Sequence, residues 1–136
     1  MIIGVPKEIK AQEHRVGLIP STALMLTRKG HTVLVQKSAG IGSGYPDQAY
    51  IDAGAQIIDT AKKVYAQAEM IVKVKEPLKA EYGLLRKEQI LFTYLHLAAS
   101  KPLTEALLKS GVTGVAYRSE ERRVGKECRS RWSPYH

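Results

Sequence analysis

Apolar residues along the chain fall into six short runs that are rich in valine and isoleucine, and segments with helical features separate them. The predicted strands span residues 2–5, 32–35, 55–58, 70–74, 90–94 and 112–117. The predicted helices span residues 20–29, 47–53, 60–68, 78–86 and 103–109. Such an alternation is typical of an α/β domain, because each helix returns the chain to the edge where the next parallel strand begins. The pattern therefore predicts a Rossmann-like or flavodoxin-like, mostly parallel sheet with helices on both faces.

The length and composition are those of one globular domain. A chain of 136 residues can bury a core of its own, and contents of 44% hydrophobic and 25% charged residues are ordinary for a soluble protein. No apolar run approaches the roughly 20 residues that are needed to cross a bilayer. Met1 leads directly into the first strand, without the basic region and cleavage site of a signal peptide. We therefore expect a cytoplasmic protein with no membrane partner, and the single cysteine agrees with that compartment.

Residues 118–136 differ in composition from the rest of the chain. They hold six basic and three acidic residues, the only cysteine and the only tryptophan, and they show neither a helical nor a strand period. One interpretation is a basic arm that contacts nucleic acid. However, the segment resembles, residue for residue, the translation of a short-read sequencing adapter. We therefore expect residues 118–136 to be a disordered, non-native tail, residues 1–117 to be the domain, and nucleic acid not to be a partner.

Two of the predicted parallel strands, residues 70–74 and 90–94, each lead to a polar residue that can do chemistry. Lys75 follows the first of these strands and His96 follows the second. Arg15 lies in the loop that leaves the first strand of the chain. Parallel strands share one carboxyl edge, and open α/β sheets bind ligands along that edge. The sequence therefore predicts that Arg15, Lys75 and His96 face one crevice.

These three side chains together suit a small carboxylic acid. An arginine offers a planar fork to a carboxylate and a lysine offers a compact charge, while a histidine donates or accepts a proton near neutral pH. A 2-keto acid, whose oxygen needs a proton, fits this set. Lys73 lies on the same strand face as Lys75, so that only the position at the strand end favours Lys75. Tyr94 shares a face with His96, where it either lines the crevice or packs in the core.

The glycine-rich loop at residues 39–44 resembles a phosphate-binding turn only superficially. It contains a Gly-x-Gly, but the third glycine of a dinucleotide fingerprint is not at the required place, and no acidic residue closes a strand about 20 residues later. We therefore predict that this loop binds no cofactor. Scattered histidines and a single cysteine give no metal-ligand spacing, so no metal site is predicted either.

Several segments are similar to one known family. They are Ile3–Glu8 (Ile-Gly-Val-Pro-Lys-Glu), Glu13–Val16, Leu26–His31, Val74–Pro77 and Ile90–Ser100, of which the last two are highly specific. Together they resemble the N-terminal catalytic domain of alanine dehydrogenase, in the alanine dehydrogenase/pyridine nucleotide transhydrogenase family. The resemblance covers residues 1–117.

The resemblance implies an enzyme that interconverts L-alanine with pyruvate and ammonia and that uses NAD. It implies that Arg15 and Lys75 bind the carboxylate and carbonyl region of pyruvate. His96 is then the acid/base on the substrate oxygen, and Glu13 orients this group. The family's separate NAD-binding domain and return segment are absent from this chain, so we expect an inactive fragment that binds no NAD itself. The resemblance also implies a homo-hexamer for the intact enzyme.

Two other functions stay open at this point. The NAD-binding subunit of the proton-translocating transhydrogenase has a homologous N-terminal domain, but the resemblance implies that it lacks the equivalents of Lys75 and His96. The second alternative is a non-catalytic module that binds small carboxylates without a cofactor.

Overall fold

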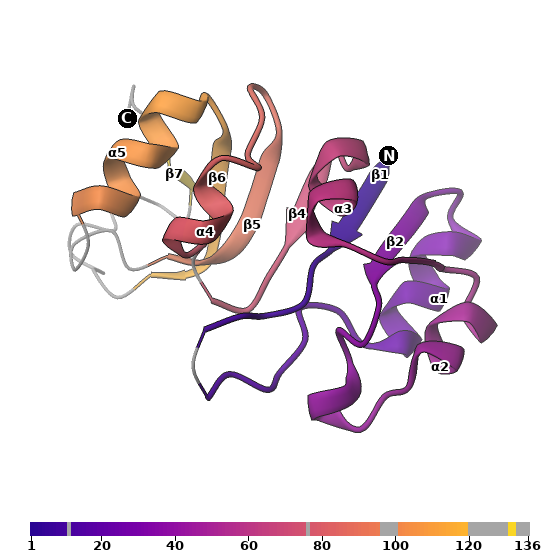
Figure 1. Cartoon of the computed structure of the whole chain (residues 1–136). Helices are drawn as coiled ribbons and strands as arrows, with labels where there is room; N and C mark the ends of the chain where they lie inside the picture. Colours follow the sequence, from indigo (N-terminus) through magenta and orange to yellow (C-terminus); the bar gives the residue numbers. More distant parts are fainter. Residues whose placement is uncertain (11, 76, 96–100, 120–130, 133–136) are drawn as a thin grey trace.

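The computed structural model describes residues 1–10, 12–75, 77–95, 101–119 and 131–132 (Figure 1). Its strands are β1 (Ile2–Val5), β2 (Thr32–Gln36), β3 (Gln56–Ile58), β4 (Met70–Val72), β5 (Ile90–Leu95), β6 (Thr113–Ser119) and β7 (Arg131–Trp132). Its helices are α1 (Pro20–Arg28), α2 (Asp47–Asp52), α3 (Ala61–Gln67), α4 (Lys79–Tyr82), α5 (Lys101–Ser110) and the 3-10 helix η1 (Ile41–Ser43). The strands form one sheet in the order β3-β2-β1-β4-β5-β6-β7. All pairings from β1 to β6 are parallel, which confirms the predicted α/β class.

Helices cover both faces of the sheet, as the sequence predicts (Figure 1). On one face, α3 and α5 bury a cluster against β4 and β5 that includes Ile71 and Leu91. On the other face, α1 and α2 pack over β1 and β2 around residues such as Val33. Gly4 in β1 allows α3 to lie directly on the strand, because a Cβ atom at Gly4 would be only 2.7 Å from the side chains of Val64 and Ala68. Close contact between helix and strand is a common reason for glycine within a strand.

Helix α4 is shorter than the helix predicted at residues 78–86. It ends at Tyr82 because Gly83, a poor helix former, follows and the chain turns there. Its first turn is fixed by Glu81, whose Oε1 accepts the backbone N–H of Leu78 at 2.9 Å. The Glu81 side chain is buried and has partners elsewhere in the fold, which the local pattern does not reveal.

Strand β7 is a second difference from the sequence prediction. Arg131 and Trp132 pair antiparallel with Val115 and Gly114 in β6, although the tail shows no strand pattern. A strand at the edge of a sheet presents unpaired N–H and C=O groups, so that a short extended segment can pair with it whatever its side chains. The non-native origin of residues 118–136 stays a prediction.

Candidate functional site

The carboxyl ends of β1 and β4 lie side by side, and the segments that leave them carry Arg15 and Lys75. β1 pairs in parallel with β4, and β4 pairs in parallel with β5, which leads toward residue 96. In Figure 1, the long segment after β1 passes below the sheet beside the segment after β4. His96 itself lies outside the described residues, so its place in the site stays a prediction. Tyr94 lies in β5 opposite Arg118, and its part in a site also stays a prediction.

Arg15 and Glu13 form a bidentate ion pair in the segment after β1. Arg15 Nε lies 2.9 Å from Glu13 Oε2, and Arg15 Nη2 lies 3.0 Å from Glu13 Oε1. The backbone N–H of Arg15 donates to the same Oε2 at 2.9 Å. The Glu13 side chain is 6% exposed and that of Arg15 is 66% exposed, so a buried carboxylate holds a guanidinium group that faces solvent. Paired hydrogen bonds of this kind fix the plane of the guanidinium group.

Electrostatics link Lys75 to this pair. The pKa of Glu13 is lowered from 4.5 to about 2, chiefly by the hydrogen bonds from the Arg15 side chain, although burial opposes the change. The hydrogen bond from the Arg15 backbone and the charges of Arg15 and Lys75 make smaller contributions to this lowering. The Lys75 charge favours the ionised form of Glu13 only weakly, and Glu13 is an anion throughout the physiological pH range.

A small pocket of about 180 Å³ opens between the segment after β1 and the loop after β2. Its lining residues are Lys7, Glu8, Glu13, His14, Arg15, Ser38, Ala39, Ile41 and Gly42. The glycine-rich loop packs tightly on this segment, because a Cβ atom at Gly42 would lie 2.6 Å from the carbonyl oxygen of His14. The Ser43 hydroxyl donates to that same oxygen at 3.1 Å. The backbone at Gly42 therefore approaches its own chain and leaves no room there for a phosphate group.

A larger groove of about 630 Å³ lies on the sheet face beside α1. Its lining residues are Met1, Ile3, Val16, Gly17, Leu18, Thr22, Leu26, His31, Met70, Val72, Val74 and Phe92. Ligand sites combine apolar walls with a few convergent polar groups, and a carboxylate needs cations. Only Thr22 and His31 carry polar side chains here, so the smaller pocket beside Arg15 is the better candidate for a carboxylate site.

Residues 4–128 match the family described as Alanine dehydrogenase/PNT, N-terminal domain. The chain belongs to this family. Over 125 residues it is 50% identical to the alanine dehydrogenase of Mycolicibacterium smegmatis. This alignment covers 92% of this chain and 34% of the relative. Over 117 residues it is 56% identical to the alanine dehydrogenase of Bacillus subtilis, and this alignment covers 86% of this chain and 31% of the relative. The chain thus spans about a third of the length of these curated relatives.

Solved structures of the alanine dehydrogenase/PNT family share the fold. An L-alanine dehydrogenase superposes with a TM-score of 0.84 at 58% identity, over 86% of this chain and 32% of that chain. A transhydrogenase from Sinorhizobium meliloti superposes with a TM-score of 0.79 at 29% identity, over 85% of this chain and 33% of that chain. The resemblance inferred from the sequence motifs is confirmed, and of these two structures the dehydrogenase is nearer in sequence.

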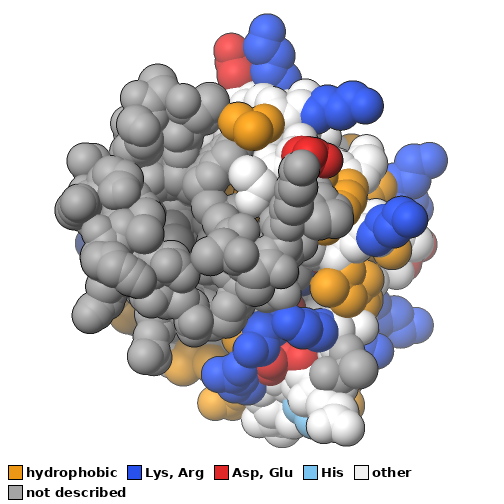
Figure 2. All heavy atoms as spheres, turned by 90° about the vertical axis from the view of Figure 1, so that its left-hand side faces the viewer, with side chains coloured by type: hydrophobic (Ala, Val, Ile, Leu, Met, Phe, Trp, Pro, Cys, Tyr) orange, Lys and Arg blue, Asp and Glu red, His pale blue; other side chains and the backbone are white. Residues whose placement is uncertain are grey.

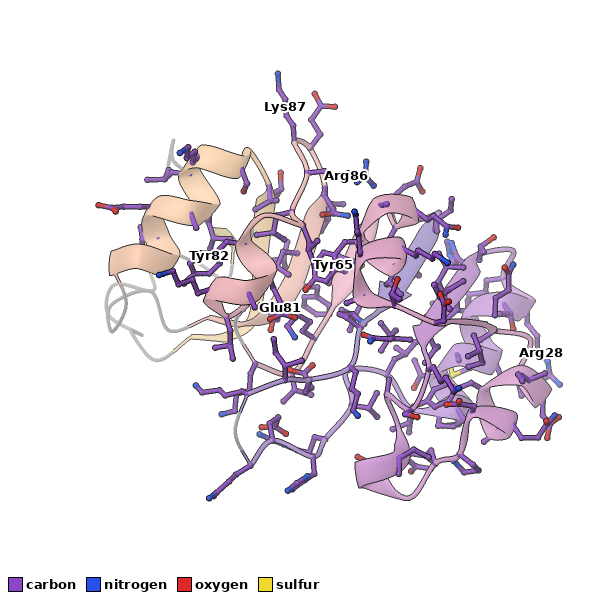
Figure 3. All side chains as sticks on the ribbon, viewed as in Figure 1. Arg28, Tyr65, Glu81, Tyr82, Arg86 and Lys87 are labelled. Carbon is purple, nitrogen blue, oxygen red and sulfur yellow. The ribbon has the colours of Figure 1, made fainter. Side chains whose placement is uncertain are left out.

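In this alanine dehydrogenase/PNT domain, Lys73 belongs to a buried ion-pair network and not to the exposed edge. Its Nζ lies 3.2 Å from Glu8 Oε1 and 3.2 Å from Glu81 Oε2, and all three side chains are at most 4% exposed. The Tyr65 hydroxyl donates to Glu81 Oε2 at 3.1 Å, and Figure 3 shows these two side chains directed toward each other from α3 and α4. Burial, followed by the nearby Glu81 charge, raises the pKa of Tyr65 well above its usual value. Lys73 is therefore buried, whereas Lys75 is half-buried. On the sequence alone, both lysines were candidates for the crevice because they share one strand face.

Sequence reasoning missed Glu8. Besides Lys73, its carboxylate accepts the backbone N–H of Val74 at 2.8 Å and that of Lys75 at 3.2 Å. This explains why β4 ends at Val72 and not at residue 74 as predicted, because these two N–H groups turn to a side chain. One signal was available: a lysine inside an apolar parallel strand requires a buried carboxylate partner.

Among the residues that the structure describes, no three His, Cys, Asp or Glu side chains are grouped to hold a metal ion. In the same part of the chain, no helix combines the length and the apolar character that crossing a bilayer requires.

On the face drawn in Figure 2, Lys and Arg side chains lie at separate places with hydrophobic side chains between them.

Proposed function

We propose that this chain is the substrate-binding N-terminal domain of an NAD-dependent alanine dehydrogenase, which interconverts L-alanine with pyruvate and ammonia. The observation that carries the proposal is that Glu8, which lines the same pocket as Glu13 and Arg15, accepts the backbone N–H of Lys75 and so joins the segments that leave β1 and β4. Identities of 50% and 56% to curated alanine dehydrogenases support it. The 29% identity to a transhydrogenase makes the alternative of a transhydrogenase subunit weaker.

Each candidate residue has a chemical task in this proposal. The Arg15 guanidinium group and the Lys75 ammonium group bind the substrate carboxylate and the adjacent carbonyl oxygen, since both are cationic donors. Glu13 orients the Arg15 guanidinium group through its bidentate ion pair. His96 transfers a proton at the substrate oxygen, and Tyr94 lines the site.

In the complete enzyme, NAD would supply the hydride-transfer chemistry. The described residues of this chain do not fit NAD, because the glycine-rich loop lacks the dinucleotide pattern and Gly42 abuts His14. We therefore assign NAD binding to a part of the parent enzyme outside this chain. Residues 1–136 alone are then inactive: purified chain oxidises no NADH with pyruvate and ammonium, and turnover above background would contradict this assignment.

We also propose that the parent enzyme is longer than this chain, hexameric and cytoplasmic. Its curated relatives are about three times as long, since the aligned segment covers 31–34% of them. The apolar groove of about 630 Å³ supports the same idea, because a later segment of the parent chain would remove this apolar surface from water. In this proposal the native domain comprises residues 1–117, and residues 118–136 are foreign to it.

Titration of pyruvate into wild-type chain and into Lys75→Ala tests the carboxylate site. Loss of one charge-assisted contact weakens binding by at least about tenfold. Lys62→Ala is the matched control, because it removes the same charge from an exposed position on α3. Equal affinity of wild type and Lys75→Ala would remove Lys75 from the site, and absence of pyruvate binding by the wild type would contradict the proposal as a whole.

A further inference from the structure

The backbone of Lys75 is held on both sides by buried side chains. Its N–H group donates to Glu8 Oε1 at 3.2 Å, and its carbonyl oxygen accepts the Thr93 hydroxyl at 3.0 Å. Glu8 and Thr93 are 7% and 0% exposed. These two hydrogen bonds, one to the N–H group and one to the carbonyl oxygen, restrict the peptide groups that flank Lys75, although this residue lies beyond the last residue of β4.

The Glu8 carboxylate is itself fixed by its surroundings. It accepts from the Lys73 ammonium group and from the N–H of Val74, and the same ammonium group is bound by Glu81. A buried carboxylate with three donors has little freedom to rotate, and a buried charge without a partner is costly. Glu8 therefore transmits the rigidity of the buried network to the segment that carries Lys75.

Glu8 also connects the two arms of the candidate site. It lies on the segment that leaves β1, seven positions before Arg15, and it lines the same pocket as Glu13 and Arg15. Through its bonds to Val74 and Lys75 it joins that segment to the one that leaves β4. The Glu8 side chain thus links the segment that bears Arg15 to the segment that bears Lys75.

We propose that Glu8 is a positioning residue that, with Thr93, holds the backbone of Lys75 so that its ammonium group is presented to the substrate carboxylate. The role of Lys75 in this inference rests on the proposed function. Glu8 does not touch the substrate; it acts through Lys75. Because precise placement of binding groups requires support from a surrounding layer of hydrogen bonds, loss of this support weakens binding without removal of any contact to the ligand.

Glu8→Gln tests the proposal in the full chain. The substitution keeps the side-chain volume and leaves Lys73 paired with Glu81, but it removes one of the two carboxylate oxygens. Glu69→Gln is the matched control, because the Glu69 carboxylate also accepts a backbone N–H, that of Ile2 at 2.8 Å, at the opposite edge of the sheet. We expect amide hydrogen exchange at Val74 and Lys75 to rise by about tenfold in Glu8→Gln and pyruvate affinity to fall by a similar factor. Glu69→Gln changes neither quantity.

A second pair of variants reaches Lys75 from the other side. Thr93→Val removes the hydroxyl that binds the Lys75 carbonyl oxygen, and its control Thr27→Val removes a hydroxyl that binds the carbonyl oxygens of Leu24 and Ala53. We expect Thr93→Val, and not Thr27→Val, to weaken pyruvate binding several-fold. This pair decides the question if Glu8→Gln fails to fold.

The two readouts separate the possible failures. Unchanged exchange at Lys75 in Glu8→Gln overturns the inference, and so does faster exchange with unchanged pyruvate affinity, because Glu8 is then only structural. If the wild type binds no pyruvate, the proposed function fails, and hydrogen exchange alone then decides whether Glu8 anchors Lys75.

Discussion

Two clusters in which carboxylates bind cations lie near the carboxyl ends of β1 and β4, and their surroundings differ. In the segment after β1, Glu13 holds Arg15, whose side chain is 66% exposed. In the interior, Lys73 pairs with both Glu8 and Glu81 at an exposure of 1%. The first cluster presents a cation to solvent, where a ligand can reach it. The second keeps its cation away from water and from any ligand.

This difference shows that the same residue types can serve ligand binding in one cluster and structural support in the other. A pair whose cation faces solvent is worth little to stability, because water screens that charge, yet a substrate carboxylate can displace or join the pair. A buried pair must be complete, because removal of one partner leaves an uncompensated charge in the interior. Glu8 belongs to the buried cluster and contacts the backbone of Lys75, so that it connects the two.

The largest expected effect comes from Lys73→Met. This change leaves Glu8 and Glu81 buried without the ammonium group that lies between them, and we expect the free energy of unfolding to fall by about 3–5 kcal/mol. Urea denaturation measures it. Lys63→Met is the matched control, because Lys63 in α3 pairs with Asp59 just before that helix, both side chains are at least 60% exposed, and the pair is worth at most about 0.5 kcal/mol. Equal losses in both variants would erase the distinction between the clusters.

Arg15→Ala is expected to act on binding and hardly on folding. We expect pyruvate affinity to fall by about 1.5–3 kcal/mol, since a charge-assisted contact is lost. The free energy of unfolding should change by less than about 1 kcal/mol, because the Arg15 side chain is largely in solvent. Calorimetric titration and urea denaturation measure the two quantities. Arg28→Ala, at the exposed end of α1 in Figure 3, should leave pyruvate affinity unchanged.

The smallest expected effect is the pH dependence of the Glu13–Arg15 pair. The pKa of Glu13 is lowered from 4.5 to about 2, so the folded state binds fewer protons than the unfolded state between these values. The pair therefore stabilises the fold above pH 4.5, and this contribution, about 1 kcal/mol or less for a screened pair, is lost as the pH falls toward 2.

Carbon-13 NMR titration of the Glu13 carboxyl group checks this prediction. In Arg15→Ala, the pKa should return toward 4.5, because the first cause of its lowering is the hydrogen bonding of that side chain. Lys63→Met, which alters a distant ion pair, should leave the titration of Glu13 unchanged. A midpoint near 4.5 in the wild type would mean that the pair does not persist in solution.

Much of the fold could be predicted because its signals are local. Pro20 at the start of α1 and the left-handed Gly30 after its end mark that helix, and the valine-rich run of β2 follows at once. The helix at residues 78–86 was predicted too long, although Gly83, which ends it, is visible in the sequence. The position of Lys75 after a strand was visible, but the bond between its backbone and Glu8 was not.

The sequence by itself determined the alternation of strands and helices, and thereby the parallel sheet whose carboxyl edge carries Arg15 and Lys75. Spacing of apolar residues, prolines and glycines acts over a few positions, so it can be read along the chain. Only the tertiary structure decided that Lys73 is buried while Lys75 stays at the edge. Lys73 and Glu8 are separated by 65 positions and meet only because β1 and β4 are neighbours in the sheet. Desolvation then makes that contact obligatory, because a buried charge requires a partner.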